Sequence, residues 1–261
     1  MSRVALVTGA SSGIGFAVCE QLLKKDWTVY GLSRRGTGPE GIRGLIADVS
    51  DEASCIQAVS RVMKEAGQID LLVNNAGFGI SGPIEFTEEK DAHDQMRVNF
   101  FGQFFMAKAV LPYMREKKSG HIVFVSSVAG EMAIPYQAFY SAGKAAVNSL
   151  ALALRNEVKD FGIKISAVMP GDARTGFTDV RRKEASGDTV YVKNVSAVAA
   201  MEKDERNGMT PAQVADVILK AGLSKNPAPF YIAGGKYKVF HLLFKLFPAR
   251  FVYWVIGLMY S

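Results

Sequence analysis

A tyrosine and a lysine four residues apart are the first residues here whose types could do chemistry together. The segment YQAFYSAGKAAV, residues 136–147, places Tyr140 and Lys144 among small residues that favour a helix. At this spacing the two side chains lie one above the other on the same helix face. The Lys144 ammonium would then lower the pKa of the phenol from about 10, making it a usable proton donor and acceptor. An unrelated tyrosine and lysine on a surface helix is the alternative that this segment leaves open.

A glycine-rich turn near the N-terminus predicts a phosphate site. TGASSGIG follows a β-branched apolar run and precedes residues at helical period. Its G-x-x-x-G-x-G spacing differs from the G-x-G-x-x-G fingerprint, but the strand, turn and helix occur in the same order. Glycines let the backbone approach a pyrophosphate, and the helix N-terminus favours its charge. A purely structural turn is the alternative. The expected cradle comprises Gly9, Ser11, Ser12, Gly13, Ile14 and Gly15.

The end of the second apolar run indicates which nucleotide binds. A carboxylate at this place would hold the adenosine ribose 2′-hydroxyl. The chain instead has Ser33, Arg34 and Arg35. Arginines suit a 2′-phosphate through charge-assisted bonds, which favours NADP(H) over NAD(H). Two solvated surface arginines are the alternative.

The elements that must position these residues alternate along the chain. Strands are expected over 3–10, 27–33, 42–49, 69–77, 120–127, 163–171 and 230–235, and helices over 11–26, 51–67, 93–118, 138–162 and 210–222. Such alternation predicts an α/β fold with a doubly wound parallel sheet. We expect one domain, residues 1–235, with a C-terminal extension over 236–261. Residues 172–209 are expected to be a functional lid or to contain a further helix.

Four motifs occur in order on these elements: TGASSGIG, NNAG at Asn74–Gly77, YSAGK at Tyr140–Lys144, and PG at Pro170–Gly171. With them the chain resembles the short-chain dehydrogenase/reductase family over nearly its whole length. The resemblance implies a Rossmann-type fold with a seven-stranded sheet and hydride transfer between a carbinol carbon and a nicotinamide. It also implies a homodimer or homotetramer that pairs through the helices around Asn99 and Tyr140.

The resemblance further implies roles for individual residues. Tyr140 would be the general acid and base, Lys144 would lower its pKa and hold the nicotinamide ribose, Ser127 would bond the substrate oxygen, and Asn99 would hold a water that links Lys144 to solvent. Ser126 is the alternative serine, although the spacing favours Ser127. Further cofactor contacts would come from Asp48, Val49, Asn75, Ala76, Gly77, Pro170, Gly171 and Thr175. The expected substrate contacts are Phe78, Ser127, Met132, Ile134 and Tyr140.

Apolar residues around the expected cleft favour a lipid-like alcohol or ketone. NNAGFGISGPIE and the C-terminal extension are similar to the hydroxysteroid and retinol dehydrogenase branches, so a steroid or another bulky lipid is the leading substrate class. General aldehydes and ketones or 3-oxoacyl substrates are the alternatives. A non-catalytic NADP(H)-binding sensor on the same fold is the alternative of another class, and the intact Asn99, Ser127, Tyr140 and Lys144 argue against it.

The C-terminal extension is aromatic and basic. Its uncharged run, Phe251–Tyr260, is about 15 Å long as a helix and cannot cross about 30 Å of hydrocarbon. Pro248 would divide the extension into two short helices. These are expected to pack over the substrate cleft or at a subunit interface, with peripheral membrane contact as the alternative.

Charge and cysteine content exclude other classes. The net charge is +6, and four basic residues with no acidic ones fall after residue 235, which leaves +2 for the rest. A body so close to neutral does not indicate a nucleic-acid binder. Two cysteines and no signal-peptide pattern at the start predict a reducing, cytoplasmic setting. Three scattered histidines predict no metal site.

Overall fold

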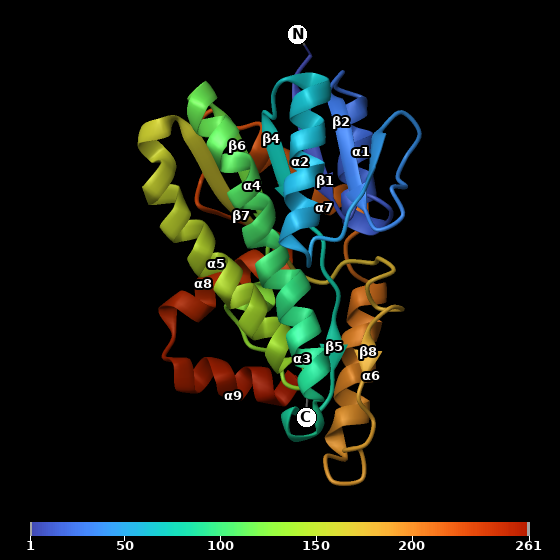
Figure 1. Cartoon of the computed structure of the whole chain (residues 1–261). Helices are drawn as coiled ribbons and strands as arrows, with labels where there is room; N and C mark the ends of the chain where they lie inside the picture. The colour runs from blue at the N-terminus through green and yellow to red at the C-terminus, as the bar shows by residue number, and fades with distance from the viewer. Residues whose placement is uncertain (1, 260–261) are drawn as a thin grey trace.

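A seven-stranded parallel sheet forms the centre of the computed structural model, which describes residues 2–259 (Figure 1). Met1, Tyr260 and Ser261 lie outside the described residues, and the last two belong to the expected extension. In spatial order the strands are β3 (Arg43–Ile46), β2 (Thr28–Ser33), β1 (Val4–Thr8), β4 (Leu71–Asn74), β6 (Gly120–Val125), β7 (Ile163–Pro170) and β9 (Phe230–Ala233). This order confirms the expected doubly wound Rossmann-type sheet.

Helices cover both faces of the sheet, because successive strand side chains point to opposite sides. Leu6 and Phe124 face one core, which is closed by α2 (Glu52–Ala66), α4 (Gly102–Lys117) and α5 (Ala138–Val158). Val7 and Val123 face the other core, which is closed by α1 (Gly13–Leu23) and α7 (Pro211–Gly222). Figure 1 shows α2, α4 and α5 together on one side. The chain's cysteines, Cys19 and Cys55, are buried free thiols in these cores.

Local capping signals fix several helix starts. Asp51 caps α2 by accepting from the backbone amides of Ala53 and Ser54. Thr210 and Gln213 form a reciprocal capping box at the start of α7, with Pro211 in its first turn. Both starts agree with the expectations from sequence.

One expected helix is interrupted. In place of a regular helix over 93–118, α3 (Glu89–Met96) leads through a π-helical turn, Arg97–Phe101, into α4. Such turns often mark functional sites, and this one contains Asn99.

The 172–209 segment contains secondary structure that the sequence did not locate. Its main element is α6 (Lys193–Arg206). Its short strand β8 (Arg182–Lys183) pairs with β5 (Ile80–Ser81) in a separate two-stranded sheet.

Elsewhere in the chain, short 3-10 helices occur at Ile84–Phe86, Val128–Gly130 and Lys159–Phe161.

Two C-terminal helices, α8 (Gly235–Leu246) and α9 (Ala249–Met259), stand beside the sheet layers and meet at the expected break (Figure 1). The Tyr237 ring on α8 fills the space that a Cβ on Gly171 would need. The extension is therefore docked against the end of β7. Of the helices in residues 2–259, none has the length and apolarity needed to cross a membrane.

Candidate active site

The expected pair lies on one helix at the carboxyl edge of the sheet. Tyr140 and Lys144 both belong to α5, and the Lys144 ammonium lies 5.7 Å from the centre of the Tyr140 ring. Lys144 is buried and donates a hydrogen bond of 2.9 Å to the Val125 carbonyl at the end of β6. The helical spacing therefore brings the two groups together, and Val125 fixes the position of the lysine.

The expected lowering of the Tyr140 pKa is wrong for this structure. Burial, which disfavours the phenolate, raises the pKa of Tyr140 to about 12, against a lowering by the Ser127 hydrogen bond. Glu205 and Asp172 raise this pKa further, whereas Arg181 lowers it. Burial also lowers the pKa of Lys144 to about 8. Burial therefore outweighs the Ser127 hydrogen bond in setting the pKa of Tyr140.

The two candidate serines differ in what they contact. Ser126 donates its hydroxyl to the Lys144 backbone carbonyl at 3.0 Å, so it ties β6 to α5. The Ser127 hydroxyl bonds to the side chain of Tyr140 and accepts the Ala129 amide at 3.1 Å. The structure therefore places Ser127, and not Ser126, beside the phenol.

Asn99 is fully buried in the π-helical turn and organises the chain after β4. Its side chain accepts the Phe78 amide at 3.0 Å and donates to the Phe78 carbonyl at 2.8 Å. A Cβ on Gly77 would lie 3.0 Å from its oxygen. The Asn99 side chain therefore positions the turn that contains Gly77 and Phe78, a contact that the sequence did not predict.

The glycine-rich turn has the backbone that a phosphate cradle requires. Gly9 and Gly13 have φ values of +70° and +57°, which L side chains rarely adopt. A Cβ on Gly15 would lie 2.3 Å from the Gly9 carbonyl oxygen. Helix α1 begins at Gly13, after Ser12, so its free amides face this turn. Ser11 and Ile14 belong to the same turn and first helical residues.

Thr8 is a positioning residue that the sequence reasoning missed. Its buried hydroxyl accepts the backbone amides of Asn75 and Ala76, both at 2.9 Å. Asn75 donates its side-chain amide to the Thr8 carbonyl at 3.0 Å. The ends of β1 and β4 are thereby held together, and ligands of open α/β sheets bind at this edge. The sequence signal that could have identified Thr8 is its position as the one polar residue at the end of the apolar strand β1.

The residues at the ends of β2 and β3 suit the adenosine part of a dinucleotide cofactor. Arg34 and Arg35 are exposed, and neither has an ion-pair partner among the described residues. Ser33 is buried and caps the turn by accepting the Thr37 amide at 3.1 Å. Asp48 is exposed and Val49 is buried at the end of β3. The two arginines therefore offer unused positive charge at this edge.

The segment after β7 reaches back to the glycine turn. The Pro170 carbonyl faces the Ser127 hydroxyl at 3.4 Å, and the Gly171 amide donates to the Ala233 carbonyl at 3.3 Å. Thr175 lies against Gly13, with 3.3 Å between the Thr175 Cβ and the position of a Gly13 Cβ. All the expected cofactor residues thus lie along one edge of the sheet.

The lid covers Tyr140. Phe177 packs against the phenol, with ring centres 5.5 Å apart, and against Gly79. Arg181 lies 5.7 Å from the Phe177 ring centre, and its fully buried side chain forms an ion pair with Glu205 of α6. Phe177 and Arg181 were not among the residues singled out from the sequence, because their role depends on how the lid folds.

The expected substrate residues do not form one apolar wall. Met132 packs with Tyr237 and Phe240 of α8, which gives an apolar wall on that side. The Phe78 ring instead carries the Arg182 guanidinium, 4.9 Å from its centre. Ile134 is part-buried, and its amide donates to the Ser141 hydroxyl at 3.2 Å.

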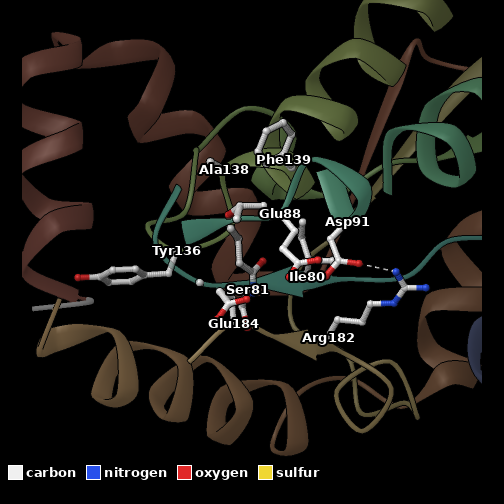
Figure 2. Close-up of a pocket in the computed structure, with 12 residues that line it drawn as sticks. Ile80, Ser81, Glu88, Asp91, Tyr136, Ala138, Phe139, Arg182 and Glu184 are labelled. Carbon is white, nitrogen blue, oxygen red and sulfur yellow. Dashed lines mark hydrogen bonds and ion pairs between the residues drawn. The ribbon is translucent and has the colours of Figure 1, made fainter. Parts of the chain in front are cut away.

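A small cavity between β5 and β8 is not the substrate site. Figure 2 shows Ser81, Tyr136 and Arg182 around it, with Arg182 bonded to Asp91 of α3 at 2.6 Å. Its volume of about 10 Å³ is enough for one water molecule. The ion pair fastens the lid strand to α3.

Comparison with known proteins decides the family. Residues 3–186 match the family described as short chain dehydrogenase. The chain belongs to the short-chain dehydrogenase family. It is 44% identical, over 87% of its length and 86% of the relative, to a 3-ketodihydrosphingosine reductase of Bacteroides thetaiotaomicron. It is 30% identical, over 95% of its length and 94% of the relative, to an NADPH-dependent 3-dehydrocapnine reductase of Ornithobacterium rhinotracheale.

The solved structures agree. A short-chain dehydrogenase from Streptomyces avermitilis superposes with a TM-score of 0.82 at 32% identity, covering 93% of this chain and 92% of that one. As a short-chain dehydrogenase, this protein is an oxidoreductase acting on CH–OH groups. The narrower resemblance to the hydroxysteroid and retinol branches is not supported, because these relatives are named for other ketones.

The residues present fit a nicotinamide dinucleotide. Gly9 and Gly13 hold a left-handed backbone in the turn that leads into α1, and Arg34 and Arg35 have no ion-pair partner among the described residues. Such a cofactor supplies the hydride. With such a cofactor bound, the phenol of Tyr140 and the Ser127 hydroxyl bonded to it would be the groups placed to give a proton and a hydrogen bond to a carbonyl oxygen.

Proposed function

We propose that this protein is an NADPH-dependent reductase of a long-chain lipid ketone, with a 3-keto sphingoid base as its substrate class. The observation that carries the proposal is the 44% identity to a 3-ketodihydrosphingosine reductase over 87% of the chain. Tyr140 is the proposed proton donor, with Ser127 beside it and Lys144 behind it. Phe177 packs against the phenol ring, and Met132 belongs to the apolar cluster around Tyr237 of α8.

The preference for NADPH rests on charge. Arg34 and Arg35 end the second strand, where a carboxylate would favour NADH, and no carboxylate pairs with either among the described residues. The relative named for 3-dehydrocapnine is NADPH-dependent. A 2′-phosphate would give these guanidinium groups their missing partner.

The deciding experiment follows absorbance at 340 nm with NADPH and NADH. The panel is 3-ketodihydrosphingosine, a steroid ketone, retinal, a short aldehyde and a 3-oxoacyl thioester. We expect turnover of the sphingoid ketone with NADPH preferred. Turnover of the steroid ketone alone would overturn the substrate class while keeping the reaction. NADPH binding without turnover of any compound would favour the non-catalytic sensor.

We also propose that the protein forms at least a dimer through α4 and α5. An apolar groove of about 430 Å³ between them is lined by Phe104, Leu111, Leu150, Leu154 and Phe161 among others. Light scattering after gel filtration should give a mass of at least twice 28.3 kDa, and Leu150→Glu should lower it. A single-chain mass for the unaltered protein would contradict this.

A further inference from the structure

We propose that α8 and α9 form a docking surface that binds an anionic lipid bilayer from one side. These two helices and Phe247 between them hold almost half of the exposed large apolar side chains among the described residues. They occupy about a tenth of the chain, so the enrichment is local. Six of these exposed side chains form what we call the apolar face: Leu242, Leu243, Leu246, Phe247, Phe251 and Trp254.

The apolar face is built from both helices. Phe247 lies 5.2 Å from Phe251, and Phe251 lies 6.0 Å from Trp254, between ring centres. These rings run from the junction of the helices along α9 and leave Trp254 61% exposed. In residues 249–258, Ile256 is the buried side chain. Such a continuous apolar strip on a protein surface indicates an interaction site.

The charge of the segment selects the occupant. Lys238, Lys245 and Arg250 are exposed and have no ion-pair partner among the described residues. Residues 236–261 contain no acidic side chain. In a symmetric contact between two copies this segment would face the same segment of the other copy, which offers cations and no acidic side chain to pair with them. An anionic lipid surface instead attracts them while the aromatic rings enter the interface.

The lengths of the helices determine how they would lie. At 1.5 Å per residue, α8 and α9 are each about 15–20 Å long, which is too short to cross about 30 Å of hydrocarbon. They would lie in the plane of the interface, as short basic aromatic helices do.

The opposite side of α8 contacts the active-site loops. The Tyr237 hydroxyl bonds to Asp172, two residues beyond Pro170, and His241 bonds to Glu131 after β6. Phe240 packs with the cluster that contains Met132. A bilayer bound to the apolar face would therefore be separated from these active-site loops by the single helix α8. Delivery of a lipid ketone by this route rests on the proposed function, whereas surface binding does not.

Vesicle binding tests the proposal without any measurement of turnover. The full chain is sedimented with phosphatidylcholine vesicles that contain or lack phosphatidylglycerol. We expect binding to the anionic vesicles, weakened at least tenfold in Leu246→Glu/Trp254→Glu. The matched control, Ile56→Glu/Ile84→Glu, adds the same charge at exposed apolar positions elsewhere and should bind normally. NADPH binding should be unchanged in all of them.

The cationic contribution has its own pair of variants. Lys238→Gln/Lys245→Gln should weaken binding to the anionic vesicles, whereas Lys64→Gln/Lys220→Gln, on exposed parts of α2 and α7, should not. Trp254 gives a second readout, because the chain has two tryptophans and Trp27 is buried. In a Trp27→Phe background, anionic vesicles should shift the emission of Trp254 to the blue.

Three results would overturn the proposal. The first is an unaltered protein that stays in the supernatant with anionic vesicles. The second is equal weakening by the face variants and their controls. The third is a lower oligomeric mass in Leu246→Glu/Trp254→Glu without any loss of vesicle binding, which would identify the face as a subunit contact.

Discussion

The ring of Phe177 lies 5.5 Å from the ring of Tyr140 and is tilted by 59° to it. Phe177 comes from the lid, whereas Tyr140 comes from the long helix α5. Within the lid, the fully buried side chain of Arg181 pairs with Glu202 and Glu205 of α6 and so holds the lid in this fold. A substrate carbonyl that approaches the Tyr140 hydroxyl would therefore either pack beside the Phe177 ring or push that ring aside. The position of the lid and the chemistry of the phenol are coupled.

Arg181→Met should loosen the lid. Removing the guanidinium leaves Glu205 as a largely buried carboxylate without its ion-pair partner, a defect of about 3–5 kcal/mol, whereas Glu202 keeps Lys183. Limited proteolysis with chymotrypsin should cleave within 172–209 at least tenfold faster. Adding Glu205→Gln should restore resistance. Arg61→Met removes an exposed ion pair on α2, outside the lid, and serves as the control; equal cleavage of both single variants would contradict the assigned role.

Tyr140→Phe should abolish turnover and leave NADPH binding nearly intact. The substitution removes the hydroxyl that we propose as the proton donor but keeps the ring that packs on Phe177. A positioned general acid contributes about 10²–10⁴-fold to a rate, so a loss in this range is expected. NADPH oxidation and NADPH fluorescence are the two readouts. Tyr113→Phe, on α4, is the control, and an unchanged rate in Tyr140→Phe would refute the proton-transfer role.

Arg34→Ala should weaken NADPH far more than NADH. The guanidinium has no competing ion pair among the described residues, so its loss removes a contact to the 2′-phosphate. Hydrogen bonds to charged groups contribute about 1.5–3 kcal/mol, which corresponds to roughly a tenfold to hundredfold rise in the Kd for NADPH. Arg115→Ala, at an exposed position near the end of α4, should change neither Kd. Equal weakening of both cofactors would argue against a phosphate contact.

His121 should make the fold sensitive to acid. It is buried between β6 and the end of α7, with Nδ1 3.0 Å from the Gly222 carbonyl oxygen, and burial lowers its pKa to about 4. The unfolded chain protonates this histidine near pH 6.5, so stability is lost as the pH falls from about 6.5 to about 4. The expected loss is about 2–3 kcal/mol.

Urea unfolding of His121→Gln at pH 7 and pH 4.5 measures this effect. The variant should lose less stability between these values than the unaltered protein, because glutamine does not titrate. His93→Gln, at an exposed histidine of α3, should lose as much as the unaltered protein. If His121→Gln also did so, acid sensitivity would have to come from other groups.

Features encoded by neighbouring residues could be predicted from the sequence. The main strands and helices followed from periodicity, and the start of the helix at Thr210 followed from its capping residue and the proline after it. Tyr140 and Lys144 share a helix because four residues make about one turn. The candidate catalytic residues were named by motif, and the fold brings Ser127, Tyr140 and Lys144 together at one edge of the sheet.

Features that depend on distant contacts could not be predicted. The π-helical turn at Asn99 is held by bonds to Phe78, and Thr8 reaches Asn75 across 67 residues. The pair β5 and β8 joins Ile80 to Arg182, too far apart for any local signal. The raised pKa of Tyr140 arises from burial that exists only once the lid has folded.

The packing of Tyr237 on Gly171 has a consequence for engineering. The aromatic ring forms part of the wall beside β7, so the last helices are not a detachable appendage. Shortening the chain before Tyr237 would open a hole at that wall. Exchanging the segment for that of a relative would redesign the wall and leave Tyr140 and Lys144 untouched. Chimeras should therefore be joined at the end of β9, after Ala233, and should keep glycine at 171 wherever the incoming helix carries an aromatic side chain.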